Sequence, residues 1–157
     1  MALSVGTKAP DFTLFNTEKK EVSLKNFAEK PLIINFFPAA FTGFCTEQMC
    51  SNRDNLSLYN DLGVSVVGVS VDTPFTQGVF KAQNKINFDL LSDFNKVMIK
   101  DYDMFLPEFV LGLKGVAKRG VALIDSNGIV VYAEETASPG TQINFAALKD
   151  ALASLKK

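Results

Sequence analysis

The sequence of 157 residues contains no histidine. This absence excludes Cys-His and Ser-His-Asp nucleophiles, which need an imidazole base, and it excludes histidine-ligated metal sites. Cysteine and arginine are also scarce, with only Cys45, Cys50, Arg53 and Arg119. A reactive side chain in this protein must therefore be activated by a helix terminus, a cation or a hydrogen-bonded hydroxyl.

Charge imbalance and long apolar runs are missing as well. The formal net charge is −1, so there is no electrostatic basis for binding nucleic acid or an acidic membrane surface. No apolar run approaches the length of a membrane span, and the first residues lack the charged and apolar regions of a secretory signal. We therefore expect a cytoplasmic protein that has neither a nucleic acid nor a membrane as its partner.

The composition is that of a soluble globular protein, with 47% hydrophobic and 21% charged residues. A chain of this length can bury a substantial core, so we expect a single domain spanning residues 1–157. Two cysteines in a reducing compartment favour catalysis or redox sensing over a structural disulfide.

Apolar patterns predict an alternation of strands and helices. Residues 102–115 are expected to form a loop, Gly63 to end the first helix and Pro74 to begin the second. The order indicates an α/β fold, a central mixed sheet with helices on both faces. The predicted strands are 11–15, 21–24, 32–37, 64–71 and 88–91, with a hairpin over 116–134, and the predicted helices are 44–62, 74–84, 95–101 and 144–155.

Both cysteines lie in the segment PAAFTGFCTEQMC, residues 38–50, directly after an apolar strand. A cysteine in the first turn of a helix lies near unfilled N–H groups and the positive end of the helix dipole, which favour the thiolate. The thiolate is the nucleophile, whereas a thiol with the reference pKa of about 8.5 is only about 3% ionised at neutral pH. Thr42 adds a hydroxyl and Pro38 a rigid wall without an N–H. Cys45 is thus the candidate nucleophile, and a buried structural thiol is the alternative.

Pro38, Thr42 and Cys45 form the pattern P-x-x-x-T-x-x-C, and on this motif the sequence resembles the peroxiredoxins, in particular the bacterioferritin-comigratory (Q-type) and AhpE-like members. The resemblance covers nearly the whole chain and implies a thioredoxin-like fold with an added N-terminal β-hairpin. It also implies a thiol peroxidase for hydrogen peroxide and small organic hydroperoxides, with no metal or organic cofactor. A thioredoxin- or glutaredoxin-type reductant and a homodimer are the implied partners.

The same resemblance implies roles for two further residues. The family carries an arginine just before an apolar stretch that ends in Ile-Asp, and Arg119 in KRGVALID matches that position. A guanidinium can hold a thiolate and a peroxide oxygen together. Arg53 is expected to be a solvated or ion-paired helix residue. Gln48 matches a Glu or Gln that orients the arginine, with Glu47 as the alternative, although either could be ordinary helix surface.

Cys50 has the spacing of the resolving cysteine in Q-type members. Five residues of unbroken α-helix separate two Cα atoms by about 8 to 9 Å, whereas a disulfide requires less than about 7 Å. A Cys45–Cys50 bond would therefore require the first turns of the helix to unwind. The alternative is that Cys50 is a bystander and an external thiol resolves Cys45, as in one-cysteine members, which the PAAFTGFC segment also resembles.

Two other functions remain open at this level. A thiol–disulfide oxidoreductase on the same fold would normally carry C-x-x-C, which is absent. A redox-sensing or chaperone-like binding module would use Cys45 oxidation to change a partner surface. Sustained peroxide turnover distinguishes the peroxidase, because a sensor needs only stoichiometric oxidation.

Overall fold

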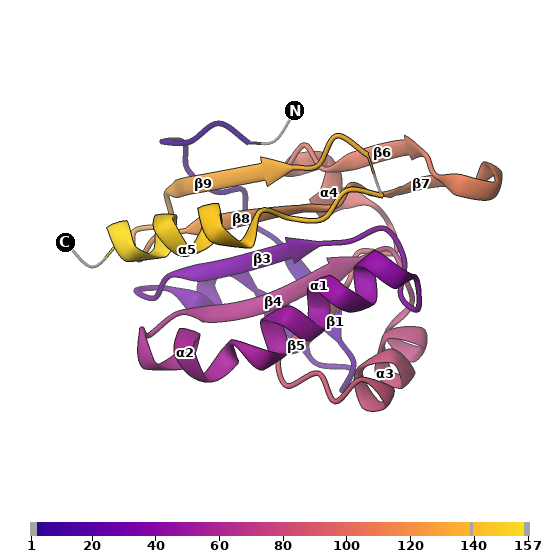
Figure 1. Cartoon of the computed structure of the whole chain (residues 1–157), viewed down its shortest axis with the longest axis horizontal. Helices are drawn as coiled ribbons and strands as arrows, with labels where there is room; N and C mark the ends of the chain where they lie inside the picture. The colour runs from indigo at the N-terminus through magenta and orange to yellow at the C-terminus, as the bar shows by residue number, and fades with distance from the viewer. Residues whose placement is uncertain (1–2, 139, 156–157) are drawn as a thin grey trace.

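The computed structural model describes residues 3–138 and 140–155 (Figure 1). Its centre is a seven-stranded sheet in the order β2-β1-β5-β4-β3-β8-β9. The central strands are apolar because both faces of the sheet are covered. The strands are β1 (Thr13–Asn16), β2 (Glu21–Ser23), β3 (Leu32–Phe36), β4 (Ser65–Ser70), β5 (Asp89–Ser92), β8 (Gly120–Ile124) and β9 (Val130–Glu135).

Strand β3 makes the sheet mixed, since it pairs parallel with β4 and antiparallel with β8. All five of its residues are buried. Side chains of a strand alternate between the two faces, so Ile33 and Ile34 belong to separate hydrophobic clusters. The register with β8 places Phe36 opposite Gly120, which brings the start of β8 beside the end of β3.

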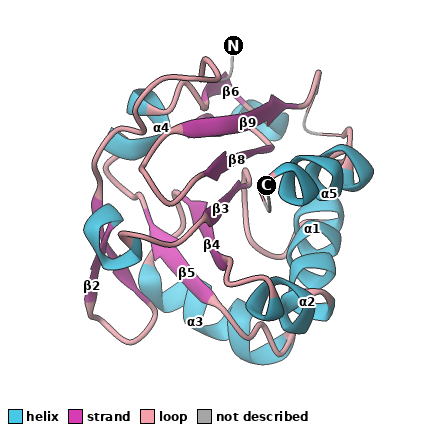
Figure 2. Ribbon diagram, turned by 90° about the vertical axis from the view of Figure 1, so that its left-hand side faces the viewer, coloured by secondary structure: helices cyan, strands magenta, loops and turns pink. Residues whose placement is uncertain are grey.

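Helices lie on both sides of the sheet, as Figure 2 shows with the sheet seen nearly edge-on. Helices α1 (Gly43–Asp54), α2 (Leu56–Asp61) and α5 (Phe145–Ser154), with Phe80 of α3 (Pro74–Gln83), pack into one cluster. Helix α4 (Val97–Asp101) packs into the other. The N-terminal hairpin β1–β2 joins the sheet through β5. The predicted fold class is confirmed, and no described helix is both long enough and apolar enough to span a bilayer.

The predicted helix over residues 44–62 is in fact two helices, which separate at Asn55. The Asn55 side chain donates to the Ser51 carbonyl at 2.8 Å, and such local hydrogen bonds compete with continued helix. Gly63 adopts a φ of 73° after α2, in agreement with its predicted role as terminator. Thr73 caps α3 and Pro74 is its first residue, also as predicted.

The prediction of a loop over residues 102–115 was wrong. This region forms β6 (Phe105–Glu108), the 3₁₀ turn η2 (Val110–Gly112) and β7 (Lys114–Ala117), which pair as a separate two-stranded sheet. Pro107 and the two glycines obscured the pattern, but Gly112 adopts a positive φ at the hairpin turn and Gly115 adopts one within β7. The hairpin predicted from residue 116 accordingly begins at Gly120, because residues 116–117 belong to β7.

Candidate active site

The loop between β3 and α1 carries the first residues of the motif. Pro38 is buried in it, and Phe41 lies half exposed with a φ of 70°. Asp72, just after β4, fixes the loop because its carboxylate Oδ2 accepts hydrogen bonds from the Ala40 N–H at 2.9 Å and the Ser70 hydroxyl at 2.7 Å. No site role for Asp72 was predicted from the sequence.

Cys45 is the third residue of α1 and has no exposed surface. Thr42 is the N-cap residue, but its hydroxyl donates to the Ala39 carbonyl at 2.8 Å. No side chain in the described part of the chain caps the helix start. The N–H groups of the first turn therefore remain available to a negative charge or ligand next to Cys45.

Arg119 precedes β8 and is 2% exposed. Its Nη2 donates to Cys45 Sγ at 3.2 Å, and its Nη1 donates to Gln48 Oε1 at 3.0 Å. The ring centroid of Phe44 lies 5.9 Å from Cζ of Arg119. The pairing of β3 with β8 explains why a residue 74 positions away reaches Cys45. A buried guanidinium needs hydrogen-bond acceptors, and Cys45 Sγ and Gln48 Oε1 are two of them.

Gln48 is fully buried on α1 and connects Arg119 to the sheet. Its Nε2 donates to Asn35 Oδ1 at 3.3 Å and to the Phe36 carbonyl at 3.4 Å. Glu47 is exposed, so of the two neighbouring candidates Gln48 is the one that contacts the arginine.

Asn35 and Asn52 complete this buried network, and sequence reasoning assigned no site role to either. The Asn52 amide donates to Asn35 Oδ1 at 3.1 Å and to the Gln48 carbonyl at 2.9 Å. Asn35 carried a signal in the sequence, because it is the one polar residue of the apolar strand β3. Asn52 carried none, since a polar residue on a helix normally lies at the surface.

Cys50 lies about 1.4 turns after Cys45 in the same unbroken helix. It is partly buried, and both cysteines are free thiols. Arg53 lies outside the cluster around Cys45 and pairs with Asp54 at 2.9 Å, as the sequence had led us to expect.

Comparison with known proteins agrees with this architecture. Residues 5–133 match the model of the AhpC/TSA family. The chain is 33% identical over 156 residues to alkyl hydroperoxide reductase E of Mycobacterium tuberculosis, covering 98% of each protein. It is also 46% identical over 91 residues to the putative peroxiredoxin bcp of Haemophilus influenzae, a match that covers 58% of this chain and 59% of that protein.

Solved structures show the same fold. Peroxidoxin BcpB from Mycobacterium tuberculosis superposes with a TM-score of 0.83 at 26% identity, covering 98% of this chain and 97% of that one. Peroxiredoxin Q of Xanthomonas campestris superposes with a TM-score of 0.77 at 25% identity, covering 92% and 89%. The chain therefore belongs to the AhpC/TSA family and is a peroxiredoxin, an oxidoreductase of the peroxidase class.

Proposed function

We propose that Cys45 is the peroxidatic nucleophile. Its thiolate attacks one oxygen of the peroxide, an S–O bond forms as the O–O bond breaks, and the departing oxygen takes a proton and leaves as water or alcohol. The observation that carries this assignment is the hydrogen bond from Arg119 to Sγ at the start of a helix. The charge that moves onto the departing oxygen would be stabilised by Arg119 and the Cys45 N–H, and by the Thr42 hydroxyl once it turns its proton away from the Ala39 carbonyl.

Gln48 and Pro38 act on the geometry of this step. Gln48 accepts from Nη1 of Arg119 and is itself held by the sheet, which supports a role in orienting the guanidinium. The buried ring of Pro38 would exclude water from one side of the loop, and proline has no N–H to donate there.

Burial of Cys45 bears on the choice of substrate. The thiol has no exposed surface in this conformation, so the first turn of α1 must move slightly to admit a peroxide. Phe41 and Phe44, which flank Thr42 and Gly43, are each about half exposed, and the Phe44 ring centroid lies 5.9 Å from Cζ of Arg119, so a peroxide would pass these apolar rings. Such an entry supports hydrogen peroxide and small organic hydroperoxides as substrates.

Cys50 would resolve the oxidised enzyme. Its thiolate attacks the sulfur of the Cys45 sulfenic acid, an S–S bond replaces the S–O bond, and the hydroxide leaves as water after taking a proton. A thioredoxin- or glutaredoxin-type protein of a reducing cytoplasm would then reduce the disulfide. If Cys50 takes no part, an external thiol must attack Cys45 instead.

An exposed apolar patch supports a homodimer. Phe15, Phe75, Phe94 and Val97 are each at least half exposed and line a groove of about 430 Å³. Two aspartates also line the groove, Asp11 and Asp101. Lysines stand over two of the rings, Lys19 over Phe75 and Lys96 over Phe94. A second copy of the same surface, related by a twofold axis, would offer both apolar area and complementary charge.

The test is peroxide consumption by the purified protein with thioredoxin and its reductase. We expect many turnovers per protein, abolished in Cys45→Ser. Oxidation that stops after one equivalent with every donor would contradict the peroxidase and favour the redox-sensing module. Sustained turnover in Cys50→Ser with thioredoxin would show that an external thiol resolves Cys45.

A further inference from the structure

The two ends of α1 are held unequally. At its start, Gly43 is a weak helix former and the Thr42 hydroxyl does not cap the first turn. The first turn has the backbone bond from Thr46 N–H to the Thr42 carbonyl at 2.9 Å and two side-chain contacts, the bond from Gln142 to the Phe44 carbonyl at 3.0 Å and that of Arg119 with Cys45. Cys50 lies between this weak start and the other end of the helix.

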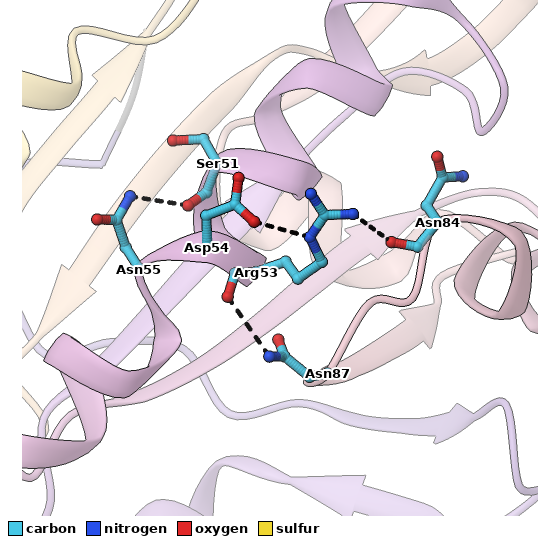
Figure 3. A network of polar contacts seen from close by, with 6 residues as sticks. All are labelled: Ser51, Arg53, Asp54, Asn55, Asn84 and Asn87. Carbon is cyan, nitrogen blue, oxygen red and sulfur yellow. Dashed lines mark hydrogen bonds and ion pairs between the residues drawn. The ribbon is translucent and has the colours of Figure 1, made fainter.

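The other end is fastened through Arg53, as Figure 3 shows. Its Nη1 donates to the carbonyl of Asn84 at 2.6 Å, and its own carbonyl accepts from Asn87 Nδ2 at 3.4 Å. Asn84 is the C-cap residue of α3, where a carbonyl lacks a partner within the helix and a cation is favourable. Arg53 therefore ties the end of α1 to the end of α3.

Arg53 is also near Cys50, because residues three apart share one side of a helix. The pKa of the Arg53 guanidinium is raised mainly by its hydrogen bond to the Asp54 carboxylate, and a negative charge on Cys50 would raise it further. Figure 3 marks the hydrogen bonds that Nε of Arg53 donates to Asp54 and that Nη1 donates to Asn84. The third nitrogen of the guanidinium, Nη2, has no hydrogen-bond partner within the described residues. A positive group thus stands beside the sulfur that would act as the second nucleophile.

From these contacts we infer that Arg53 is a positioning residue for the resolving step. It keeps Cys50 and the end of α1 in place while the first turn unwinds and carries the Cys45 sulfenic acid toward it. When one of two reacting sulfurs is kept in a fixed position, productive encounters between them become more frequent. The inference rests on the resolving role proposed above for Cys50, and it assigns Arg53 no part in the attack on peroxide.

The experiment separates the two chemical steps in Arg53→Met, Arg53→Lys and the wild type. The first oxidation is followed by competition with a haem peroxidase for hydrogen peroxide. Resolution is followed by trapping the sulfenic acid with dimedone at timed intervals and measuring the disulfide by mass spectrometry. Lys81→Met is the matched control, because Lys81 is a cation in the last turn of α3 that pairs with Asp89 rather than with α1.

We expect Arg53→Met to oxidise Cys45 at the wild-type rate but to form the disulfide at least about tenfold more slowly, the effect of losing one charge-assisted hydrogen bond. Arg53→Lys should recover part of the rate, since an ammonium can still donate to the Asn84 carbonyl. Amide exchange over residues 50–54 should be faster in Arg53→Met, and Lys81→Met should match the wild type throughout.

Equal resolution rates in Arg53→Met and the wild type would overturn the inference and leave the resolving role of Cys50 intact. A parallel loss of both steps, with no recovery in Arg53→Lys, would also overturn it, because Arg53 would then only support the fold. A wild type that never forms the Cys45–Cys50 disulfide would refute the proposed resolving role first and this inference with it.

Discussion

Replacing Arg119 tests the proposed site most directly. Arg119→Met removes the hydrogen bonds of the guanidinium to Cys45 Sγ and to Gln48 Oε1 and leaves an unbranched apolar side chain. Arg119→Lys keeps the positive charge, but a single ammonium lacks the planar fork that bridges the sulfur and the amide at 3.2 and 3.0 Å. The two variants therefore separate the effect of charge from the effect of geometry.

The magnitude follows from the position of the guanidinium. Loss of one preorganised donor to a developing charge typically raises a barrier by about 2.7 to 4 kcal/mol, or about 100- to 1,000-fold in rate. We expect this loss in Arg119→Met and a smaller loss, of about tenfold or more, in Arg119→Lys. Arg119→Met should also destabilise the fold by about 1 to 3 kcal/mol, because buried Gln48 Oε1 loses its donor.

The assay is the second-order rate constant with hydrogen peroxide, measured by competition with a haem peroxidase, together with chemical denaturation of each variant. Lys118→Met is the matched control, since Lys118 is the neighbouring cation and pairs with Glu135 at 2.6 Å. Rate constants for both Arg119 variants within the error of the control would refute the assignment of Arg119 as the active-site cation.

Four further predictions concern other residues. Cys45→Ser should lose peroxidase activity while its circular dichroism is unchanged, because one nucleophile carries the chemistry; more than a trace of turnover would contradict this. Gln48→Ala should lower the rate constant with peroxide less than Arg119→Met does, because the guanidinium stays and loses only the acceptor that orients it. An equal loss of rate in the two variants would mean that Gln48 does more than orient the guanidinium. Cys50→Ser should be oxidised once at nearly the wild-type rate and then stall as the sulfenic acid with a thioredoxin donor, as mass spectrometry would detect; release from the stall would indicate an external resolving thiol. Phe75→Glu should convert a dimer to a monomer in analytical ultracentrifugation, because it places a charge in the apolar patch; an unchanged sedimentation coefficient would exclude this surface as the dimer contact.

Much of the fold could be predicted because its central elements have strong local signals. Strand β3 is apolar except for Asn35, and Pro74 and Gly63 mark helix ends whose observed geometry fits them. Strands β6 and β7 could not be predicted in the same way. They are four residues each, β6 contains a proline, and the turn between them depends on positive φ values.

The contact between Cys45 and Arg119 could not be derived from local patterns. Nothing in residues 38–50 specifies a partner 74 positions away. Arg119 was assigned to the site because it matches the arginine position of the peroxiredoxin family. The structure supplies the physical cause, which is the register of β3 against β8. The role of Asn52 could not be predicted for a different reason. Its side chain is buried only because α1 packs on the sheet, and the helix sequence alone does not show that.

The conflict between the helical spacing of the two cysteines and the disulfide proposed for them can be resolved by the order of events. In the reduced protein, Cys45 and Cys50 lie in one unbroken helix, whose geometry keeps their Cα atoms about 8 to 9 Å apart. Arg119 holds the first turn through Cys45 Sγ, and a thiolate strengthens that bond. Oxidation to sulfenic acid removes the negative charge and with it much of this attraction. In the proposed mechanism the uncapped first turn would then open at a free energy below that of global unfolding, and the reaction with peroxide would itself release the segment that must move for Cys50 to attack.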